Sequence, residues 1–349
     1  MAENQAPQAD APTIEPASRQ VNVVVAGFQG VLASALTGVV DMLCLAGVSW
    51  QRIAGEPPVP GFQVRVASED GEPVQCLNGL VIHAQTRFSE LKQSSSMDVL
   101  VIPTIGGPIS KVLASNDELL DLIRWAKQQG IAIVGNCTGT FLLAEAGVLN
   151  DTTATTHWGY QQAFSQRYPQ VDLRADLLIT HDQGVYCAGG GLAWFDLGLL
   201  LIEHYMGYDK AVQTAKAFVI DYRRESQLTY RLASLAQHHQ DALVSGAQRV
   251  FQQRYGDAGL SLEAVADQLN VSTRTLIRRF KTALKITPYE YLQQLRMDVA
   301  QKRLTETSDS LEQVVDHVGY EDVSSFRRLF KRKTGLTPLD YRKRFAKRF

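Results

Sequence analysis

The stretch GYEDVSSFRRLFKRKTGLTPLDYRKRF (Gly319–Phe345) decides the fold of the last third of the chain. It opens with a short turn and continues into a run in which Phe326 and Phe330 lie four positions apart, on one face of a helix. The remaining face is polar and basic, with Val323, Ser324, Arg327, Arg328 and Lys331. This pattern predicts a helix that buries two phenylalanines and presents cations to solvent.

The same pattern occurs a second time, about 50 residues earlier. Phe280, Thr287, Pro288 and Tyr291 recur as Phe330, Thr337, Pro338 and Tyr341. Upstream the offset is 49, since Val265, Ala266 and Leu269 match Val314, Val315 and Val318, so the second copy has one inserted residue in its turn. A repeat at this spacing indicates two copies of one helical unit.

Each copy has the pattern of a helix–turn–helix. In the first, we expect helices at 261–269 and 273–281, with Ser272 as the N-cap of the second helix, which buries Leu276 and Phe280. Its outward residues are Thr273, Arg274, Ile277, Arg278 and Lys281. One such helix would be ordinary. Two with arginines at matching offsets indicate a binding surface, because the planar guanidinium can bond guanine bidentately or clamp a phosphate.

The charge distribution agrees with this interpretation. Residues 245–349 contain 20 Lys and Arg against 12 Asp and Glu, a balance of +8, whereas residues 1–244 contain 15 against 24, a balance of −9. A basic third joined to an acidic remainder is typical of a nucleic-acid-binding module attached to another domain. From charge alone, the alternative stays open that these charges are simply exposed to solvent and have no binding function.

Gly319–Phe345 resembles the signature of the AraC/XylS family of transcriptional regulators. The resemblance implies an all-α C-terminal domain of seven helices in two helix–turn–helix subdomains, joined by a long helix at 288–304. It also implies that the two recognition helices enter successive major grooves of double-stranded DNA, about 34 Å apart. The base-reading residues it implies are Arg274, Ile277, Arg278, Val323, Ser324, Arg327 and Arg328.

The first 220 residues have a different pattern, in which short apolar runs alternate with helical stretches. The β-branched runs at 21–28, 62–68, 98–104 and 131–136 are typical of strands buried on both faces of a parallel sheet. Helical patterns occupy 116–129, with Ser115 or Asn116 as N-cap and Gly130 at the end, and 191–207. The alternation predicts a three-layer α/β sandwich with a mostly parallel, flavodoxin-like sheet.

One local motif in this region suggests a site. In IAIVGNCTGTFLLAEAG (Ile131–Gly147), Cys137 lies between Gly135 and Gly139 at a strand-to-helix turn, the thiol counterpart of a nucleophile elbow. We expect the helix N-terminus to lower the thiol pKa and to offer free N–H groups to an anion. Gly106 and Gly107 are expected to supply further backbone donors. A buried cysteine at a tight junction is the simpler alternative.

Residues 21–207 resemble the PfpI-like group of the class I glutamine amidotransferase-like superfamily. The resemblance makes His157, in ATTHW (154–158), a candidate partner of Cys137. Catalytic members carry an acidic residue early in the chain, but the matching position here is Ala35, and Asp41 belongs to a helix. Thr138 stands where protease-like members have histidine. A Cys–His pair without the acid argues against catalysis.

The combination of the two domains resembles the GlxA-like subgroup of regulators, and this resemblance implies an N-terminal domain that senses a small metabolite. Amino acids and quaternary-ammonium compounds are among the ligand types of the subgroup, and Trp158 or Trp194 could face such a cation. The candidate ligand residues are Gly106, Gly107, Cys137, Thr138, His157 and Trp158. A homodimer is expected, because dimers are common among such regulators.

Composition limits the remaining function classes. Cys44, Cys76, Cys137 and Cys187 form no C-x-x-C pair, so we expect neither a zinc site nor a disulfide framework. No cofactor and no other metal are expected. The chain has no apolar run long enough for a membrane helix and no signal-peptide pattern, so a cytoplasmic location without membrane contact is expected. The expected organisation is a disordered tail (1–19), a sensing domain (20–220), a partly helical linker (221–245) and a DNA-binding domain (246–349).

Three function hypotheses follow. A ligand-controlled regulator, with activation as its expected effect, needs the double helix–turn–helix, the basic domain and a ligand site. A cysteine-dependent amidase or glyoxalase-like enzyme fused to a DNA-binding domain needs a complete catalytic set. Ala35 argues against this hypothesis, because it stands where catalytic members have an acidic residue. A redox sensor needs a low-pKa accessible thiol and a resolving cysteine, and none lies near Cys137 in the sequence. The regulator is the predicted function.

Overall fold

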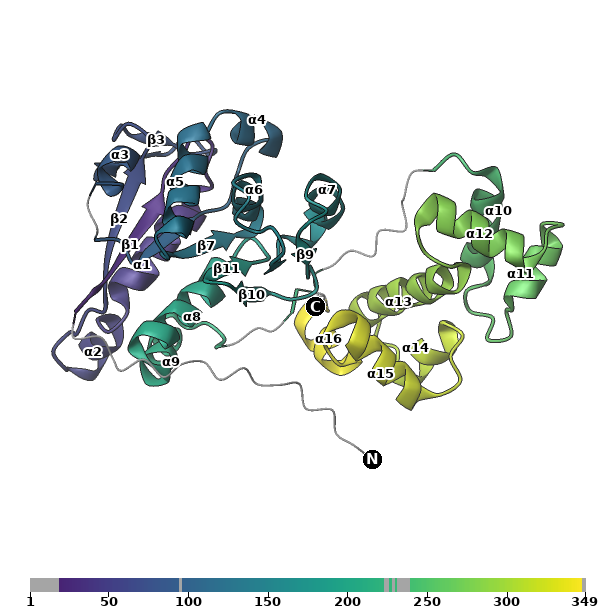
Figure 1. Cartoon of the computed structure of the whole chain (residues 1–349). Helices are drawn as coiled ribbons and strands as arrows, with labels where there is room; N and C mark the ends of the chain where they lie inside the picture. The colour runs from purple at the N-terminus through teal and green to yellow at the C-terminus, as the bar shows by residue number, and fades with distance from the viewer. Residues whose placement is uncertain (1–18, 94–95, 223–225, 228–229, 231–238, 347–349) are drawn as a thin grey trace. The chain divides into compact units, whose positions relative to one another are not determined.

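The computed structural model describes residues 19–93, 96–222, 226–227, 230 and 239–346 (Figure 1). The chain divides into two compact units, Met1–Gln227 and Leu228–Phe349. Residues 1–18 of the expected tail and most of the expected linker lie outside the described residues. Arg19, placed in the tail by the sequence pattern, instead pairs with Asp98 of the first unit, with Nη2 and Oδ1 2.7 Å apart.

The first unit is built on a seven-stranded sheet. In spatial order its strands are β10 (Ile179–Asp182), β11 (Val185–Ala188), β7 (Ala132–Asn136), β6 (Val99–Ile102), β1 (Val21–Ala26), β2 (Phe62–Ser68) and β5 (Thr86–Arg87). All neighbours pair in parallel except β10 and β11, which form an antiparallel hairpin at one edge. Two short pairs, β3 (Val74–Gln75) with β4 (Val81–Ile82) and β8 (Thr153–Ala154) with β9 (Asp172–Leu173), lie outside this sheet.

Helices cover both faces of the sheet, which makes the first unit a three-layer sandwich, as predicted (Figure 1). One layer contains α1 (Ala33–Leu45), α2 (Ser49–Ala54), α8 (Trp194–Met206) and α9 (Tyr208–Phe218). The other contains α3 (Phe88–Leu91), α4 (Ile109–Ala114), α5 (Asp117–Gln128) and α6 (Thr140–Glu145). A further helix, α7 (Gln161–Arg167), follows β8. Because both faces are covered, all four residues of β6 are buried.

The start of α5 differs from the predicted cap. Asn116 occupies the N-cap position, but its side chain accepts no capping bond; its Nδ2 donates to Val112 O at 2.6 Å instead. The Ser115 hydroxyl donates to Lys111 O of the preceding helix. Asp117 and Glu118 in the first turn place negative charge at the positive end of the helix dipole, which stabilises this end without a side-chain cap.

The second unit contains seven helices among its described residues. They are α10 (Ala242–Arg254), α11 (Leu262–Gln268), α12 (Thr273–Leu284), α13 (Pro288–Glu306), α14 (Leu311–His317), α15 (Val323–Thr334) and α16 (Pro338–Phe345). Asp241 caps α10 by accepting from the amides of Leu243 and Val244, so the end of the expected linker is part of this unit. No helix in the described parts of either unit is long and apolar enough to cross a membrane.

The sequence repeat corresponds to two separate hydrophobic cores. Phe280 and Tyr291 pack edge to face in the first core, with ring centroids 5.8 Å apart; Phe330 and Tyr341 do the same in the second at 5.4 Å. Thr287 and Thr337 cap the helices that carry the tyrosines, each followed by proline at the first helical position. The repeated residues are therefore a core pair and the cap that positions it.

Arg296, on the long helix α13, joins the two halves of the second unit. Its Nε donates to Tyr255 O at 2.8 Å and its Nη2 to Asp257 O at 2.8 Å, both just after α10 of the first half. Its guanidinium also lies 5.4 Å from the ring centroid of Tyr320, in the turn before α15. A Cβ on Gly319, at φ +71°, would lie 2.9 Å from Arg296 Nη2. One arginine thus contacts both halves.

Candidate functional site

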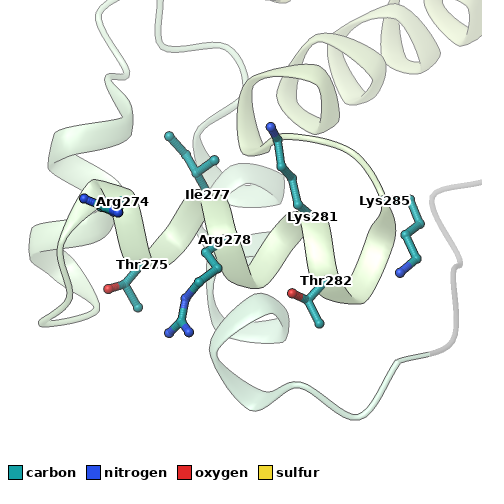
Figure 2. A pocket seen from close by; sticks show the side chains of 7 residues that line it. All are labelled: Arg274, Thr275, Ile277, Arg278, Lys281, Thr282 and Lys285. Carbon is teal, nitrogen blue, oxygen red and sulfur yellow. The ribbon is translucent and has the colours of Figure 1, made fainter.

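An open groove runs along the outer face of α12 (Figure 2). It is lined by Arg274, Thr275, Ile277, Arg278, Lys281, Thr282 and Lys285. The arginines and lysines are exposed and Ile277 is half-buried. The groove is therefore a cationic surface with one apolar residue and hydroxyls, a composition suited to a polyanion that also offers methyl groups and hydrogen-bonding edges.

The sequence builds this face by burying the opposite one. Ser272 caps α12 by accepting from the amide of Thr275 at 3.2 Å, and Leu276, Phe280 and Leu284 enter the core. Four of the five predicted outward residues line the groove. The fifth, Thr273, is the first helical residue and is half-buried.

Three lining residues are not anticipated by the sequence pattern: Thr275, Thr282 and Lys285. Thr282 and Lys285 line the groove because α12 continues to Leu284, one turn beyond the predicted end at Lys281, whereas Thr275 lies within the predicted helix but outside the predicted outward set. Arg279 behaves differently from its neighbours. Its Nε lies 2.6 Å from Asp241 Oδ2 at the start of α10, so this cation holds two helices together.

The matching helix of the second half is α15. Asp322 caps it by accepting from the amides of Ser324 and Ser325. The predicted outward residues Ser324, Arg327, Arg328 and Lys331 are exposed, and Val323 is half-buried. Arg328 Nη2 donates to Ser325 Oγ at 2.9 Å, which orients the guanidinium. Arg332 and Lys333 add exposed cations beyond the predicted set.

Arg278→Ala and Arg328→Ala should each relax base preference at one half of the bound sequence. A bidentate arginine–guanine contact discriminates by about 1–3 kcal/mol, and its loss leaves the other half unaffected. Binding to a panel of duplexes with single base changes measures the effect. Arg279→Ala is the matched control, because its guanidinium is engaged with Asp241; unchanged preference in both test variants would show that the wrong faces are assigned.

The first unit contains the predicted cysteine elbow. Cys137 is a buried residue at φ +56°, a backbone conformation that non-glycine residues adopt only where the surroundings impose it. Glycines on both sides allow the turn. A Cβ on Gly139 would lie 2.4 Å from Pro103 O, and one on Gly135 would lie 2.6 Å from Leu143 Cδ1. The turn therefore packs closely against the end of β6 on one side and against α6 on the other.

The environment of the thiol contradicts the expected low pKa. Burial raises the pKa of Cys137 above its usual value, and this outweighs hydrogen bonding to the sulfur by Thr138 and by the hydroxyl of Thr104. The following helix, α6, has only six residues. Cys137 is therefore a neutral thiol at physiological pH, poorly suited to act as a nucleophile or redox sensor.

The ATTHW segment lies against the elbow, as Thr156 Oγ1 donates to Cys137 O at 2.8 Å. His157, however, directs Nδ1 to the amide of Gly159, from which it accepts at 3.0 Å. Its ring is half-buried and lies 5.2 Å, between centroids, from Trp158. Burial lowers the pKa of His157 below its usual value. The structure thus presents a neutral imidazole beside an indole.

Gly106 and Gly107 do not offer the expected donors. Their amides both donate to Gly30 O, at 2.9 and 3.2 Å, and so are already occupied. A Cβ on Gly106 would also meet Gly30 O at 3.0 Å and Leu77 at 2.9 Å. Gly106 is needed because the loop after β6 packs closely on the chain after β1, whereas a Cβ on Gly107 would meet only Val112 Cγ2, at 3.9 Å. Both amides are therefore occupied in this structure, and a ligand-binding role of the two glycines stays a prediction.

The remaining predicted positions belong to the fold. Ala35 is buried on α1 and carries no acid, and Asp41 is exposed on the same helix. Trp194 is buried, and its ring packs so closely on α1 that a Cβ on Gly38 would lie 2.1 Å from it. Asn136 Oδ1 is a buried acceptor without a partner among the described residues. In the same ranges, no three His, Cys, Asp or Glu side chains could hold a metal.

Comparison with known proteins finds a family match for each of the two units. Residues 46–203 match the DJ-1/PfpI family and residues 265–344 match a helix-turn-helix domain family. The HTH-type transcriptional regulator CdhR of Pseudomonas aeruginosa is 29% identical over 87% of this chain and 88% of its own length. The HTH-type transcriptional regulator GlxA of Rhizobium meliloti is 25% identical over 64% of this chain and 68% of its own.

An enzyme is also among the relatives. Isonitrile hydratase of Pseudomonas putida is 30% identical over 155 residues, 44% of this chain and 64% of its own length. That match covers under half of the chain, whereas CdhR extends over both units. The chain belongs to the AraC-type helix–turn–helix transcriptional regulators that carry an N-terminal DJ-1/PfpI domain.

Proposed function

We propose that this regulator is a sequence-specific activator controlled by a small metabolite bound near the Cys137 elbow. The observation that carries the DNA-binding part is the pair of exposed basic faces, on α12 and α15, each built on its own core. The predicted contact residues are Thr273, Arg274, Ile277, Arg278, Lys281, Val323, Ser324, Arg327, Arg328 and Lys331. Thr275, Thr282 and Lys285 join them as groove residues.

The functional domains in this proposal follow the described structure. The sensing domain extends from Arg19 to Gln227, since Ser226 and Gln227 bond within the first unit. The DNA-binding domain starts at the Asp241 cap. We include homodimerisation in the proposal, and sedimentation of the full chain tests it.

The effector site proposed here comprises Cys137, Thr138, His157 and Trp158. The side chains at the elbow carry no fixed charge: Cys137 is a neutral thiol, Thr138 Oγ1 donates to Ile105 O and Thr156 Oγ1 donates to Cys137 O. The neighbouring indole and neutral imidazole are both half-buried, and an indole face attracts a quaternary ammonium or a protonated amine. These features favour amino acids and quaternary-ammonium carboxylates as the effector class.

Two measurements test the two halves of the proposal. Selection of duplexes from a random pool by the full chain should yield one sequence motif with two half-sites. A thermal-shift screen of the full chain against amino acids and quaternary-ammonium carboxylates should yield a compound that raises Tm, because a ligand bound only to the folded state stabilises it. Failure to select any motif would contradict DNA recognition, and a screen without a shift would contradict the effector class.

Substitution of Cys137 separates a binding role from a chemical one. Cys137→Ser is nearly isosteric and should keep the elbow and the Tm shift, weakened at most. Cys137→Phe should remove the shift, because the elbow is closely packed on both sides, while DNA binding by the other unit persists. If the effector still raised the Tm of Cys137→Phe, the effector site would not be at the Cys137 elbow.

An enzymatic function is the second candidate, and the strained cysteine together with the isonitrile hydratase match favours it. It requires a thiolate and an aligned base, whereas Cys137 is neutral and His157 Nδ1 is bonded to Gly159. Turnover of isonitriles, amides or glyoxals that Cys137→Ser abolishes would establish it. We therefore propose regulation without catalysis.

A further inference from the structure

Gln227 is a buried polar residue beyond the end of the predicted sensing domain. Its side chain is about 1% exposed, although the next residue, Leu228, already opens the second unit. Burial of an amide is costly unless each polar atom has a partner. A glutamine in this position therefore needs a built socket, and the first unit supplies one.

The socket satisfies both ends of the amide. Gln227 Oε1 accepts from the amide of Trp158 at 3.1 Å. Nε2 donates to Thr156 O at 2.8 Å, and it lies 3.2 Å from both Thr155 Oγ1 and Leu177 O. The preceding residue adds a second attachment, because Ser226 Oγ donates to Asp176 O at 2.9 Å. The side chain is thus held by the segment that carries His157 and Trp158.

The same socket adjoins the elbow on two sides. Thr156, whose carbonyl accepts from Gln227, donates its hydroxyl to Cys137 O. On the other side Gly189 follows Ala188, which pairs with Asn136, the residue before Cys137. A Cβ on Gly189 would lie 2.3 Å from Gln227 Nε2, so the glycine leaves just enough space for the amide.

We propose that this socket is a docking surface for Ser226 and Gln227, and that effector binding at the elbow releases Gln227. The inference rests on the proposed function and specifies how the site is regulated. A ligand that contacts His157 and Trp158 must act on the segment whose backbone holds Gln227. A ligand that binds the undocked arrangement more tightly shifts the chain toward it. In this proposal the arrangement with Gln227 docked has the lower affinity for DNA.

Two variants empty the socket from opposite sides. Gln227→Ala removes the amide, and Gly189→Ala places a methyl group where the amide lies. Each has a matched control in the same unit. Gly190→Ala adds a Cβ with no atom within 4 Å, and Gln170→Ala removes an exposed amide whose bond is to Asn150. Because Gly189 lacks a positive φ, its substitution adds no backbone strain.

The experiment measures the affinity of the full chain, in buffer without metabolites, for the duplex that the parent chain selects. Both socket variants should bind that duplex about 5- to 150-fold more tightly than the parent, the range of typical coupling between sites. Both controls should match the parent. A merely structural role would weaken binding or leave it unchanged, so a gain in affinity is specific to release.

Hydrogen exchange of the Trp158 amide in the same proteins reports whether the socket is empty. Faster exchange together with parental affinity in both variants overturns the inference while DNA recognition stands. Unchanged exchange also overturns it, because Gln227 then does not hold the segment. If Gln227→Ala does not fold, Gly189→Ala decides alone. If the parent selects no duplex, the proposed function fails, and this inference fails with it.

Discussion

Binding of the full chain to its selected duplex should weaken about 10³-fold between 50 and 200 mM monovalent salt. Seven exposed cations line the α12 groove or belong to the predicted outward set of α15: Arg274, Arg278, Lys281, Lys285, Arg327, Arg328 and Lys331. If about six of them meet phosphates, each displaces nearly one condensed counterion, and a fourfold rise in salt then costs about three orders of magnitude in affinity. Fluorescence anisotropy across a salt series measures the slope.

A variant that lacks one cation is the control for the salt titration. Lys281→Ala removes one cation and should reduce the slope of log affinity against log salt by about one, with little change in base preference. Affinity that stays constant between 50 and 200 mM would contradict binding through these faces. A slope that persists after all seven cations are replaced would assign DNA binding to another surface.

Phe280→Ala and Phe330→Ala should each destabilise one half of the DNA-binding unit by about 3–5 kcal/mol, the usual cost of removing a core phenylalanine ring. Both rings are fully buried, but in different cores. We therefore expect loss of protection in α11 and α12 for the first variant and in α14 and α15 for the second, measured by hydrogen exchange.

The repeat supplies matched controls at equivalent positions. Tyr289 and Leu339 each follow the proline of the repeated motif, and both are more than half exposed. Their replacement by alanine should change the free energy of unfolding by under about 0.5 kcal/mol. If Phe330→Ala opened α12 as much as α15, the two halves would share one cooperative core, and the assignment of separate cores would be wrong.

The helices of the second unit are predictable from sequence because the capping residues and the apolar pattern there indicate the same helix boundaries. Ser272 and Thr287 cap their helices, and Pro288 starts α13. The central strands are predictable for the same reason, since continuous apolar runs such as Val99–Ile102 of β6 occur where both faces of the sheet are buried. The edge hairpin is not, because β10 reads Ile-Thr-His-Asp and lacks an apolar pattern.

The cysteine site has properties that a local sequence motif cannot predict. The elbow itself follows from Gly135 and Gly139, whose small size the turn requires. The pKa of Cys137 depends on burial by distant segments, which the motif does not contain. The occupied amide of Gly106 depends on Gly30, 76 positions earlier. Gln227 carries no motif at all, and its role depends on where the chain returns after α9.

The contact of Arg296 with both halves of the second unit has a consequence for the DNA sequences that this regulator can use. A protein whose two reading helices are held at one separation measures the distance between half-sites as well as their bases. One extra base pair advances the second half-site by about 3.4 Å and rotates it by about 34° around the duplex axis. If the protein cannot follow, the DNA must twist or bend, and its flexibility becomes part of the recognised signal.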